Sequence, residues 1–242
     1  GIRGLRYPLA FADGDVPAQS TIATFAVSVA LPADRKGTHM SRLIEMLEEL
    51  SAPGAAPLTV VGMRALLDQL LVRLDAPGGR VEAAFPWFVR KTAPISGVAS
   101  LLDYEVRLAG EIHGDRYASV VTVAVPVTSL CPCSKEIAEY GAHNQRSTIT
   151  ISVRPREAVR LSDLLRVAET EASSELYGIL KRADEKYLTE RAYDNPRFVE
   201  DLVRGVAARL AADPRYAGYA VEAENFESIH NHSAFARIAR GI

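Results

Sequence analysis

The chain lacks the features that would place it in a membrane or on a nucleic acid. No apolar run approaches the ~20 residues that a membrane-spanning helix needs, and the longest one, around residues 120–127, is strand-like. The start shows no signal-peptide order of charged, apolar and small residues. The formal net charge of -2 gives no support to nucleic-acid or membrane-surface binding. We therefore expect a cytoplasmic protein with no nucleic-acid and no membrane partner.

Cysteine is also scarce, and the only two, Cys131 and Cys133, are separated by one residue. A disulfide between such near neighbours would be strained, and a reducing cytosol would not preserve it. Two thiols this close favour metal binding or chemical reactivity. The alternative is a pair of buried structural cysteines, because buried cysteine is common.

What the chain does contain is an ordinary globular composition, with 242 residues, 48% hydrophobic and 24% charged. This length is enough for one large or two modest domains with a sizeable core. Apolar residues at helical spacing predict helices over residues 59–74, over residues 164–180 with Ser162 as cap, and after a Thr38 cap. The pair Asn195-Pro196 predicts the start of a further helix that runs to about residue 211.

Strands are predicted where the apolar period changes to two. From Arg80, alternate residues through Val89 share one face, and Pro86 within that strand predicts an edge position or a bulge. The other predicted strands cover residues 21–31, 101–112, 117–127, 147–153, 219–226 and 230–238. Strands, two helices and strands, in that order twice, predict an α+β duplication with helices on one face of antiparallel sheets.

The segment Cys131-Pro132-Cys133-Ser134-Lys135 directly follows a valine-rich strand. Zinc accepts thiolate, imidazole and carboxylate ligands. A one-residue gap lets one sulfur bind a metal while the other faces the same pocket, and Lys135 is expected to favour the thiolate. His143 gains weight among the five histidines because it follows this segment so closely.

His230 and His232 are two residues apart, so both project to one side of an extended chain. Their surroundings, Glu227-Ser228-Ile229-His230-Asn231-His232-Ser233, are too polar to serve packing, which favours a functional site over a polar turn between strands. Glu185 and Glu200 are weaker candidates. Glu185 fits a solvated helix face, and Glu200 fits an i,i+4 pair with Arg204.

Five segments, in order along essentially the whole chain, resemble the prokaryotic GTP cyclohydrolase IB family. The segments that contain Cys131-Pro132-Cys133-Ser134-Lys135 and Glu227-Ser228-Ile229-His230-Asn231-His232 are the most specific of them. The segments are Leu5-Arg6-Tyr7-Pro8, Gly37-Thr38-His39-Met40-Ser41-Arg42, Ser129-Leu130-Cys131-Pro132-Cys133-Ser134-Lys135, His143-Asn144-Gln145-Arg146-Ser147 and Glu227-Ser228-Ile229-His230-Asn231-His232.

The resemblance implies the tunnelling fold (T-fold), with one module over residues 1–115, a second over residues 116–242 that carries the metal site, and a homotetramer. It implies hydrolysis of GTP to 7,8-dihydroneopterin triphosphate and formate, the first step of tetrahydrofolate synthesis and a source for deazapurine (queuosine) synthesis. The implied cofactor is a divalent zinc or manganese ion. The resemblance implies Cys131, His143, Glu185 and His230 as metal ligands, Cys133, Glu227 and His232 as catalytic residues, and Glu200 as the anchor of the guanine edge.

Two other functions compete with this interpretation. A tunnelling-fold NADPH-dependent nitrile reductase also uses a cysteine and a glutamate, but its Glu-Ser-Lys-Ser-Leu-Lys type of segment is absent from this chain. A non-catalytic, metal-bearing interaction protein would fill its coordination shell and leave no open position.

Overall fold

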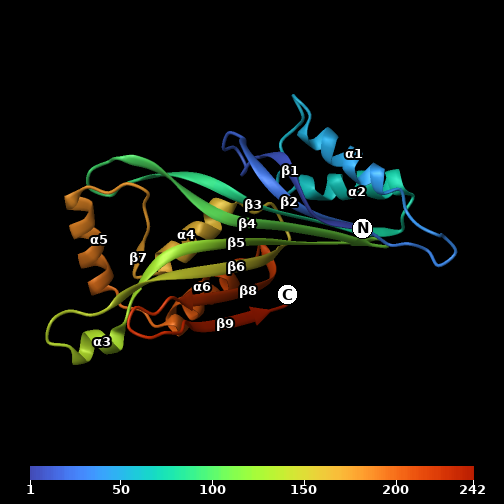
Figure 1. The fold of residues 1–242 in the computed structure, drawn as a ribbon. Helices are drawn as coiled ribbons and strands as arrows, with labels where there is room; N and C mark the ends of the chain where they lie inside the picture. The colour runs from blue at the N-terminus through green and yellow to red at the C-terminus, as the bar shows by residue number, and fades with distance from the viewer. The chain divides into compact units, whose positions relative to one another are not determined.

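A computed structural model describes residues 1–242. Figure 1 shows the strands and helices along the chain. In chain order they are β1 (Ile2–Phe11), β2 (Gln19–Val29), α1 (Met40–Ser51), α2 (Gly62–Leu74), β3 (Gly78–Thr92), β4 (Ala99–His113), β5 (Arg116–Leu130), α3 (Pro132–Ile137), β6 (Asn144–Pro155), α4 (Leu161–Glu171), β7 (Ser174–Glu175), α5 (Arg182–Asp194), α6 (Val199–Ala212), β8 (Tyr216–Asn225) and β9 (Ala234–Arg240).

The strands form one sheet in the order β1-β2-β3-β4-β5-β6-β8-β9, and the short β7 pairs with β5 beside this path. The pairs β1–β2, β2–β3, β5–β7 and β8–β9 are antiparallel. The predicted α+β class with an antiparallel sheet is therefore confirmed. None of the helices combines the length and the apolar character needed to cross a membrane.

The chain divides into two compact units that interleave along the sequence. The first comprises Gly1–Trp87, Glu105–Thr122 and Arg154–Arg160, and the second comprises Phe88–Tyr104, Val123–Val153 and Leu161–Ile242. Each unit draws residues from both sides of residue 115, where the boundary between two modules is predicted. That boundary stays a prediction.

In the first unit, α1 and α2 bury leucine and methionine side chains at helical spacing, as the pattern predicts. Gly110 on β4 permits the close approach of α2, because a Cβ atom there would lie 2.7 Å from Met63 Cγ and 2.8 Å from Leu67 Cδ1. The rings of Phe11 and Phe85 lie 4.9 Å apart between centroids within the same core. This unit carries none of the predicted metal ligands.

In the second unit, α6 contacts α4, β8 and β9, and its buried face is the predicted apolar one. Alternate residues of β5, β6 and β8 are buried. Because residues two apart point to the same face, the buried residues of these three strands share one face of the sheet. Predicted site residues follow the ends of these strands.

Three predicted helix boundaries are wrong. Thr38 does not cap α1, whose N-cap is His39 without a side-chain hydrogen bond. The helix predicted over residues 164–180 begins at Leu161 and ends at Glu171, with Ser162 inside it. It ends early because Ser173 turns to β5, where its amide donates to Thr128 O at 3.2 Å and its hydroxyl accepts from Leu130 N at 3.0 Å.

Asn195 ends α5 as its C-cap and does not begin α6. Its side-chain amide donates to Ala172 O at 2.8 Å, and Asp201 accepts from the amide of Phe198, the true N-cap of α6, at 3.0 Å. For Pro86 the sequence predicts an edge position or a bulge; β3 lies between β2 and β4, but it is not paired with β2 at this residue, so the edge character is local. The proline is tolerated there because the register with β2 ends at Ala84, two residues earlier.

Candidate active site

Three strands of the second unit change in the same way toward one end. Their buried alternate residues are apolar within the sheet and become polar at the strand end, and a predicted site residue follows two positions further on. The series are Val127 and Ser129 on β5, followed by Cys131; Ile149, Ser147 and Gln145 on β6, read against the chain direction and followed by His143; and Ala223 and Asn225 on β8, followed by Glu227. Three of the predicted site residues, Cys131, His143 and Glu227, therefore each lie two positions beyond a buried polar residue at the end of a strand.

The cysteine turn joins β5 to α3. Cys131 is the N-cap of α3 and Pro132 is its first residue, where the missing amide hydrogen costs no hydrogen bond. Cys131 is half-buried, Cys133 is exposed, and both are free thiols. The two sulfurs therefore have different surroundings although one residue separates them.

The same turn is joined to His143 by backbone and serine contacts. The Cys131 amide donates to His143 O at 3.2 Å. The Ser134 hydroxyl donates to Cys131 O at 3.1 Å and accepts from His143 N at 3.1 Å. Cys131 and His143 are thus held next to each other by the backbone.

The His143 ring has a defined partner, Ser228, whose hydroxyl lies 3.2 Å from Nδ1. This contact occupies one ring nitrogen and leaves Nε2 as the nitrogen available to a ligand. Ser228 belongs to the loop between β8 and β9, and the Phe226 amide in that loop donates to Arg146 O at 2.9 Å. The loop is thereby attached to the strand that begins beside His143.

His230 and His232 lie in this loop, outside the strand predicted to begin at residue 230. Their rings stack with centroids 5.2 Å apart and an angle of 22° between planes, so they do lie on one side of the chain. Both are exposed, and Glu227 is half-buried. The loop presents polar side chains that the core does not use.

Glu185 and Glu200 are both exposed near the starts of their helices, α5 and α6. The alternative role for Glu200, an ion pair with Arg204, is wrong because Arg204 pairs with Asp201 at 3.7 Å. Glu185 lines a cavity of about 260 Å³ together with Arg146, Thr128 and Tyr177. The cavity lies between the first turn of α5 and β5 and β6, and its lining residues on these strands point away from the buried face of the sheet.

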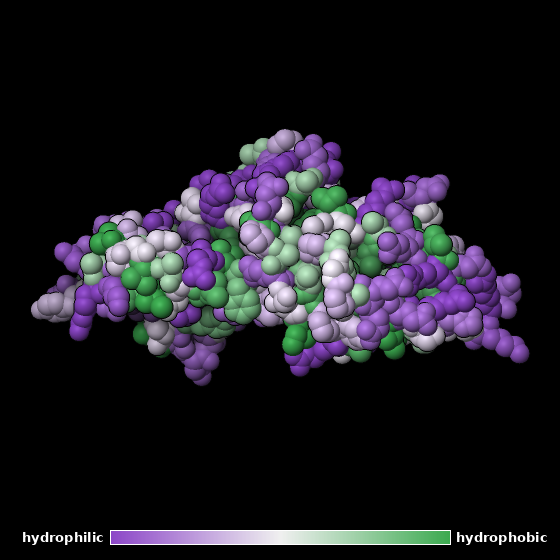
Figure 2. Space-filling model, turned by 90° about the horizontal axis from the view of Figure 1, so that it is seen from above, coloured by the Kyte–Doolittle hydropathy of each residue, from purple (hydrophilic) through white to green (hydrophobic).

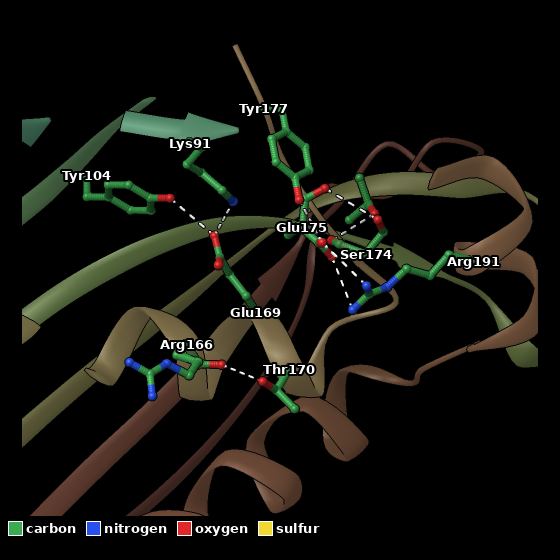
Figure 3. Close-up of polar contacts among 10 residues, drawn as sticks. Lys91, Tyr104, Arg166, Glu169, Thr170, Ser174, Glu175, Tyr177 and Arg191 are labelled. Atoms are coloured by element: carbon green, nitrogen blue, oxygen red, sulfur yellow. Dashed lines mark hydrogen bonds and ion pairs between the residues drawn. The ribbon is translucent and has the colours of Figure 1, made fainter. Parts of the chain in front are cut away.

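A partly buried polar network adjoins this cavity (Figure 3). Tyr177 donates to Glu175 at 2.9 Å, and Arg191 pairs with Glu175 at 3.2 Å. Lys91 lies 4.5 Å from the centre of the Tyr177 ring and pairs with Glu169 at 2.5 Å. Burial and the carboxylate of Glu175 both raise the pKa of Tyr177, so this hydroxyl stays protonated as a hydrogen-bond donor.

The structure does not gather three or more His, Cys, Asp or Glu side chains into a group that would hold a metal. Cys131 and His143 are neighbours, whereas Glu185 lies on α5 and His230 lies in the loop between β8 and β9. Lys135 does not serve the thiols as expected, because its ammonium group donates to Tyr193 O at 2.5 Å and lies over that ring at 4.1 Å.

The sequence pattern does not predict the roles of several residues in this region. Ser134 and Ser228 hold the backbone and the ring of His143, and no spacing rule marks them. Ser129, Ser147 and Asn225 do carry a signal, because they are polar where the period of two requires apolar residues.

A family model and two similar proteins match this chain over nearly its whole length. A family model described as type I GTP cyclohydrolase folE2 matches residues 1–236. A protein named GTP cyclohydrolase FolE2 from Burkholderia thailandensis is 56% identical over 240 residues, covering 99% of this chain and 88% of that protein. One named GTP cyclohydrolase FolE2 2 from Cupriavidus metallidurans is 57% identical over 238 residues, covering 98% and 87%.

Solved structures with a similar fold are urate oxidases. A highly active mutant of the Bacillus sp. TB-90 enzyme has a TM-score of 0.61 at 9% identity and covers 100% of this chain and 99% of that chain. The uricase of Arthrobacter globiformis has a TM-score of 0.53 at 12% identity and covers 100% and 92%. At these identities the likeness concerns the fold alone.

Proposed function

The chain belongs to the type I GTP cyclohydrolase FolE2 family, and from this premise we propose that it hydrolyses GTP to 7,8-dihydroneopterin triphosphate and formate. The observation that carries the proposal is the family match over residues 1–236, with relatives at 56% and 57% identity across nearly the full chain. The match favours this reaction over the nitrile reductase and over a non-catalytic interaction protein. The product would enter the folate pathway, and deazapurine synthesis as well.

We propose Cys131, His143, Glu185 and His230 as ligands of a zinc or manganese ion. The donor set fits such an ion in its chemistry, since it combines a thiolate, two imidazoles and a carboxylate. The Ser228 contact at 3.2 Å leaves one His143 ring nitrogen available, as an oriented metal ligand requires. No hydrogen bond or ion pair holds the side chains of Glu185 and His230, so ligation would break none. When bound, the ion would supply Lewis acidity that makes water a stronger nucleophile at neutral pH.

Other side chains would move protons and select the base. Ring opening and loss of formate require proton transfers, for which we propose Glu227 with His232 and the Cys133 thiol in reach of the reacting base. Glu200 would accept two hydrogen bonds, from N1–H and the 2-amino group of guanine. Adenine offers neither donor and would leave this carboxylate unpaired.

We also propose the tunnelling fold with two modules, assembled as a homotetramer in the cytoplasm. The fold likeness to urate oxidases at TM-scores of 0.53 to 0.61 supports the fold part of this proposal. The first half has two strands, two helices and two further strands; the second half has the same order of strands, helices and strands, with the short α3 between β5 and β6, and with α4, the short β7, α5 and α6 before β8 and β9.

The test is an assay of the purified protein with GTP after loading with zinc or with manganese. We expect release of formate together with a pterin that fluoresces after oxidation. Protein that leaves GTP intact with both ions would contradict the cyclohydrolase assignment. ATP is the matched control and should survive, because the Glu200 carboxylate finds no donor on adenine.

A further inference from the structure

The polar layer at the ends of β5, β6 and β8 is a continuous chain of buried side chains. Gln145 Nε2 donates to Ser129 Oγ at 3.0 Å, and Ser129 Oγ lies 2.7 Å from Ser147 Oγ. Ser147 Oγ donates to Asn225 Oδ1 at 2.8 Å. Because the Ser147 hydrogen is used on Asn225, Ser129 must be the donor to Ser147. All three hydrogen bonds therefore run in one direction, from Gln145 on β6 to Ser129 on β5, back to Ser147 on β6 and on to Asn225 on β8.

These four residues are too buried to serve solvent contacts. Ser129 is 0% exposed, Ser147 1%, Asn225 4% and Gln145 6%. Replacing a pair of hydrogen-bonded groups at such depth by well-packed apolar groups of the same shape can leave stability unchanged or raise it, whereas a polar group left there without a partner destabilises the fold. Apolar residues occupy the equivalent positions deeper in the same strands, so packing alone does not account for the polar layer.

The position of this hydrogen-bonded chain of side chains in the sheet indicates its role. Each strand it joins leads within two residues to a proposed site residue, namely Cys131 after Ser129, His143 before Gln145 and Glu227 after Asn225. A hydroxyl or amide hydrogen bond has a narrow distance and angle range, whereas apolar contact tolerates sliding. The hydrogen bonds among these side chains therefore fix the register of the three strand ends relative to one another more tightly than apolar packing would.

We propose that Gln145, Ser129, Ser147 and Asn225 are positioning residues that hold Cys131, His143 and Glu227 in mutual register. This inference rests on the proposed function, since it concerns residues assigned to that site. None of the four touches the substrate or the metal in this proposal. Gln145 Oε1 is buried without a donor in the protein, so the chain has an open end beside His143 where a water molecule or a bound group can donate.

The test removes one oxygen from the middle of the chain with Ser147→Ala. We expect the dissociation constant for Co²⁺, read from the thiolate-to-cobalt absorption band, to rise about 10- to 100-fold, the usual effect of losing a residue that orients metal ligands. We expect kcat to fall with it, and Ser147→Thr, which keeps the hydroxyl, to recover most of both losses. Should Ser147→Ala fail to fold, Ser129→Ala interrupts the same chain and carries the same expectation.

The matched control is Ser100→Ala, which removes another buried serine hydroxyl, one that accepts from the Ile179 amide at 3.1 Å. It should lower the urea midpoint about as much as Ser147→Ala does but leave cobalt affinity unchanged. Equal cobalt affinities in the two variants would overturn the inference, because the chain would then serve stability alone. A double variant, Ser129→Ala with Asn225→Ala, should weaken cobalt binding by less than the product of the single effects, since one break already disconnects the chain. Full multiplication of the single effects would also overturn it.

Measurements on the wild-type protein distinguish failure of the proposed function from failure of the positioning role. If it neither binds cobalt nor consumes GTP, the proposed function fails and this inference fails with it. If it does both, and Ser147→Ala retains both, only the positioning role is overturned.

Discussion

At the scale of single residues, the two thiols differ in more than sequence position. Cys131 is half-buried at the N-cap of α3 and its amide is bonded to His143 O, whereas Cys133 is exposed on the first turn. The backbone contact to a proposed ligand supports Cys131 as the sulfur that binds the metal. Cys133 then remains the second thiol of the site.

We expect Cys131→Ala to abolish metal binding, because the only soft ligand of the set is lost. Cys133→Ala should keep the metal and lose turnover. Metal content per protein and formate release measure the two effects separately. Equal metal loss in both variants would mean that both sulfurs are ligands, and loss in Cys133→Ala alone would exchange their roles.

At the scale of elements, Asp184 ties the start of α5 to the turn after β3. Its carboxylate accepts from the amides of Ile95 and Ser96 at 2.9 Å and from Lys181 at 2.8 Å. Burial opposes the charged form, but the hydrogen bonds from Ser96, Lys181 and Ile95 outweigh it and hold the pKa well below its ordinary value of 3.8.

A lowered pKa in the folded state stabilises the protein above the unfolded pKa, and this stabilisation is lost as the pH falls toward the folded pKa. We therefore expect Asp184→Asn to lower the urea midpoint at neutral pH, and the difference from wild type to shrink as the pH falls below about 4. Urea unfolding at several pH values measures it. A difference that stays constant with pH would contradict the ionised, hydrogen-bonded carboxylate.

A second element-scale contact joins β3 and β4 to α4 through Glu169 (Figure 3). Glu169 accepts from Lys91 at 2.5 Å and from Tyr104 at 3.2 Å, and its side chain is only 21% exposed, against 11% for Lys91. Burial raises the pKa of Tyr104, and the Glu169 charge adds to that effect. The pair is nearly removed from water, so each charge depends on the other.

We expect Lys91→Met to cost about 3 kcal/mol of unfolding free energy, because it leaves the Glu169 carboxylate buried without its cation. Adding Glu169→Gln should recover part of this loss, since the uncompensated charge is then gone. Denaturant unfolding measures both. Lys186→Ala, which breaks the exposed pair with Glu190, is the control and should cost no more than about 0.5 kcal/mol. Additive losses in the double variant would argue against a coupled buried pair.

At the scale of the whole molecule, the surface bears on assembly. Figure 2 shows hydrophobic residues in several groups among hydrophilic ones on the face it presents. Phe235 is 73% exposed on β9, the last strand of the sheet, whose outer edge has no neighbour in this chain. Such an edge with a large apolar side chain is suited to pairing with a second chain.

We expect light scattering to give a tetramer, and Phe235→Arg to shift it toward smaller species with loss of GTP turnover. Val72→Arg is the matched control, because Val72 is an exposed apolar residue on α2, 82% exposed. It should leave the mass unchanged. A wild-type monomer with full turnover would contradict the proposed assembly.

Local patterning was sufficient for most elements of this fold, because a period of two or of 3.6 needs only neighbouring residues to be read. It failed where a distant partner competes. Ser173 leaves the predicted helix to bond β5, and Asn195 bonds back to Ala172.

The same division holds for the site. The segments around Cys131, His143 and His230 carry the family resemblance, and their thiol and imidazole groups predict a metal site from residue identity alone, since ligand chemistry depends on the atoms a side chain carries. Which groups orient these residues depends on strand register, and register depends on pairing between segments 16 to 78 residues apart. The chain from Gln145 to Asn225 is invisible as a motif for that reason, and only the folded sheet brings its four members together.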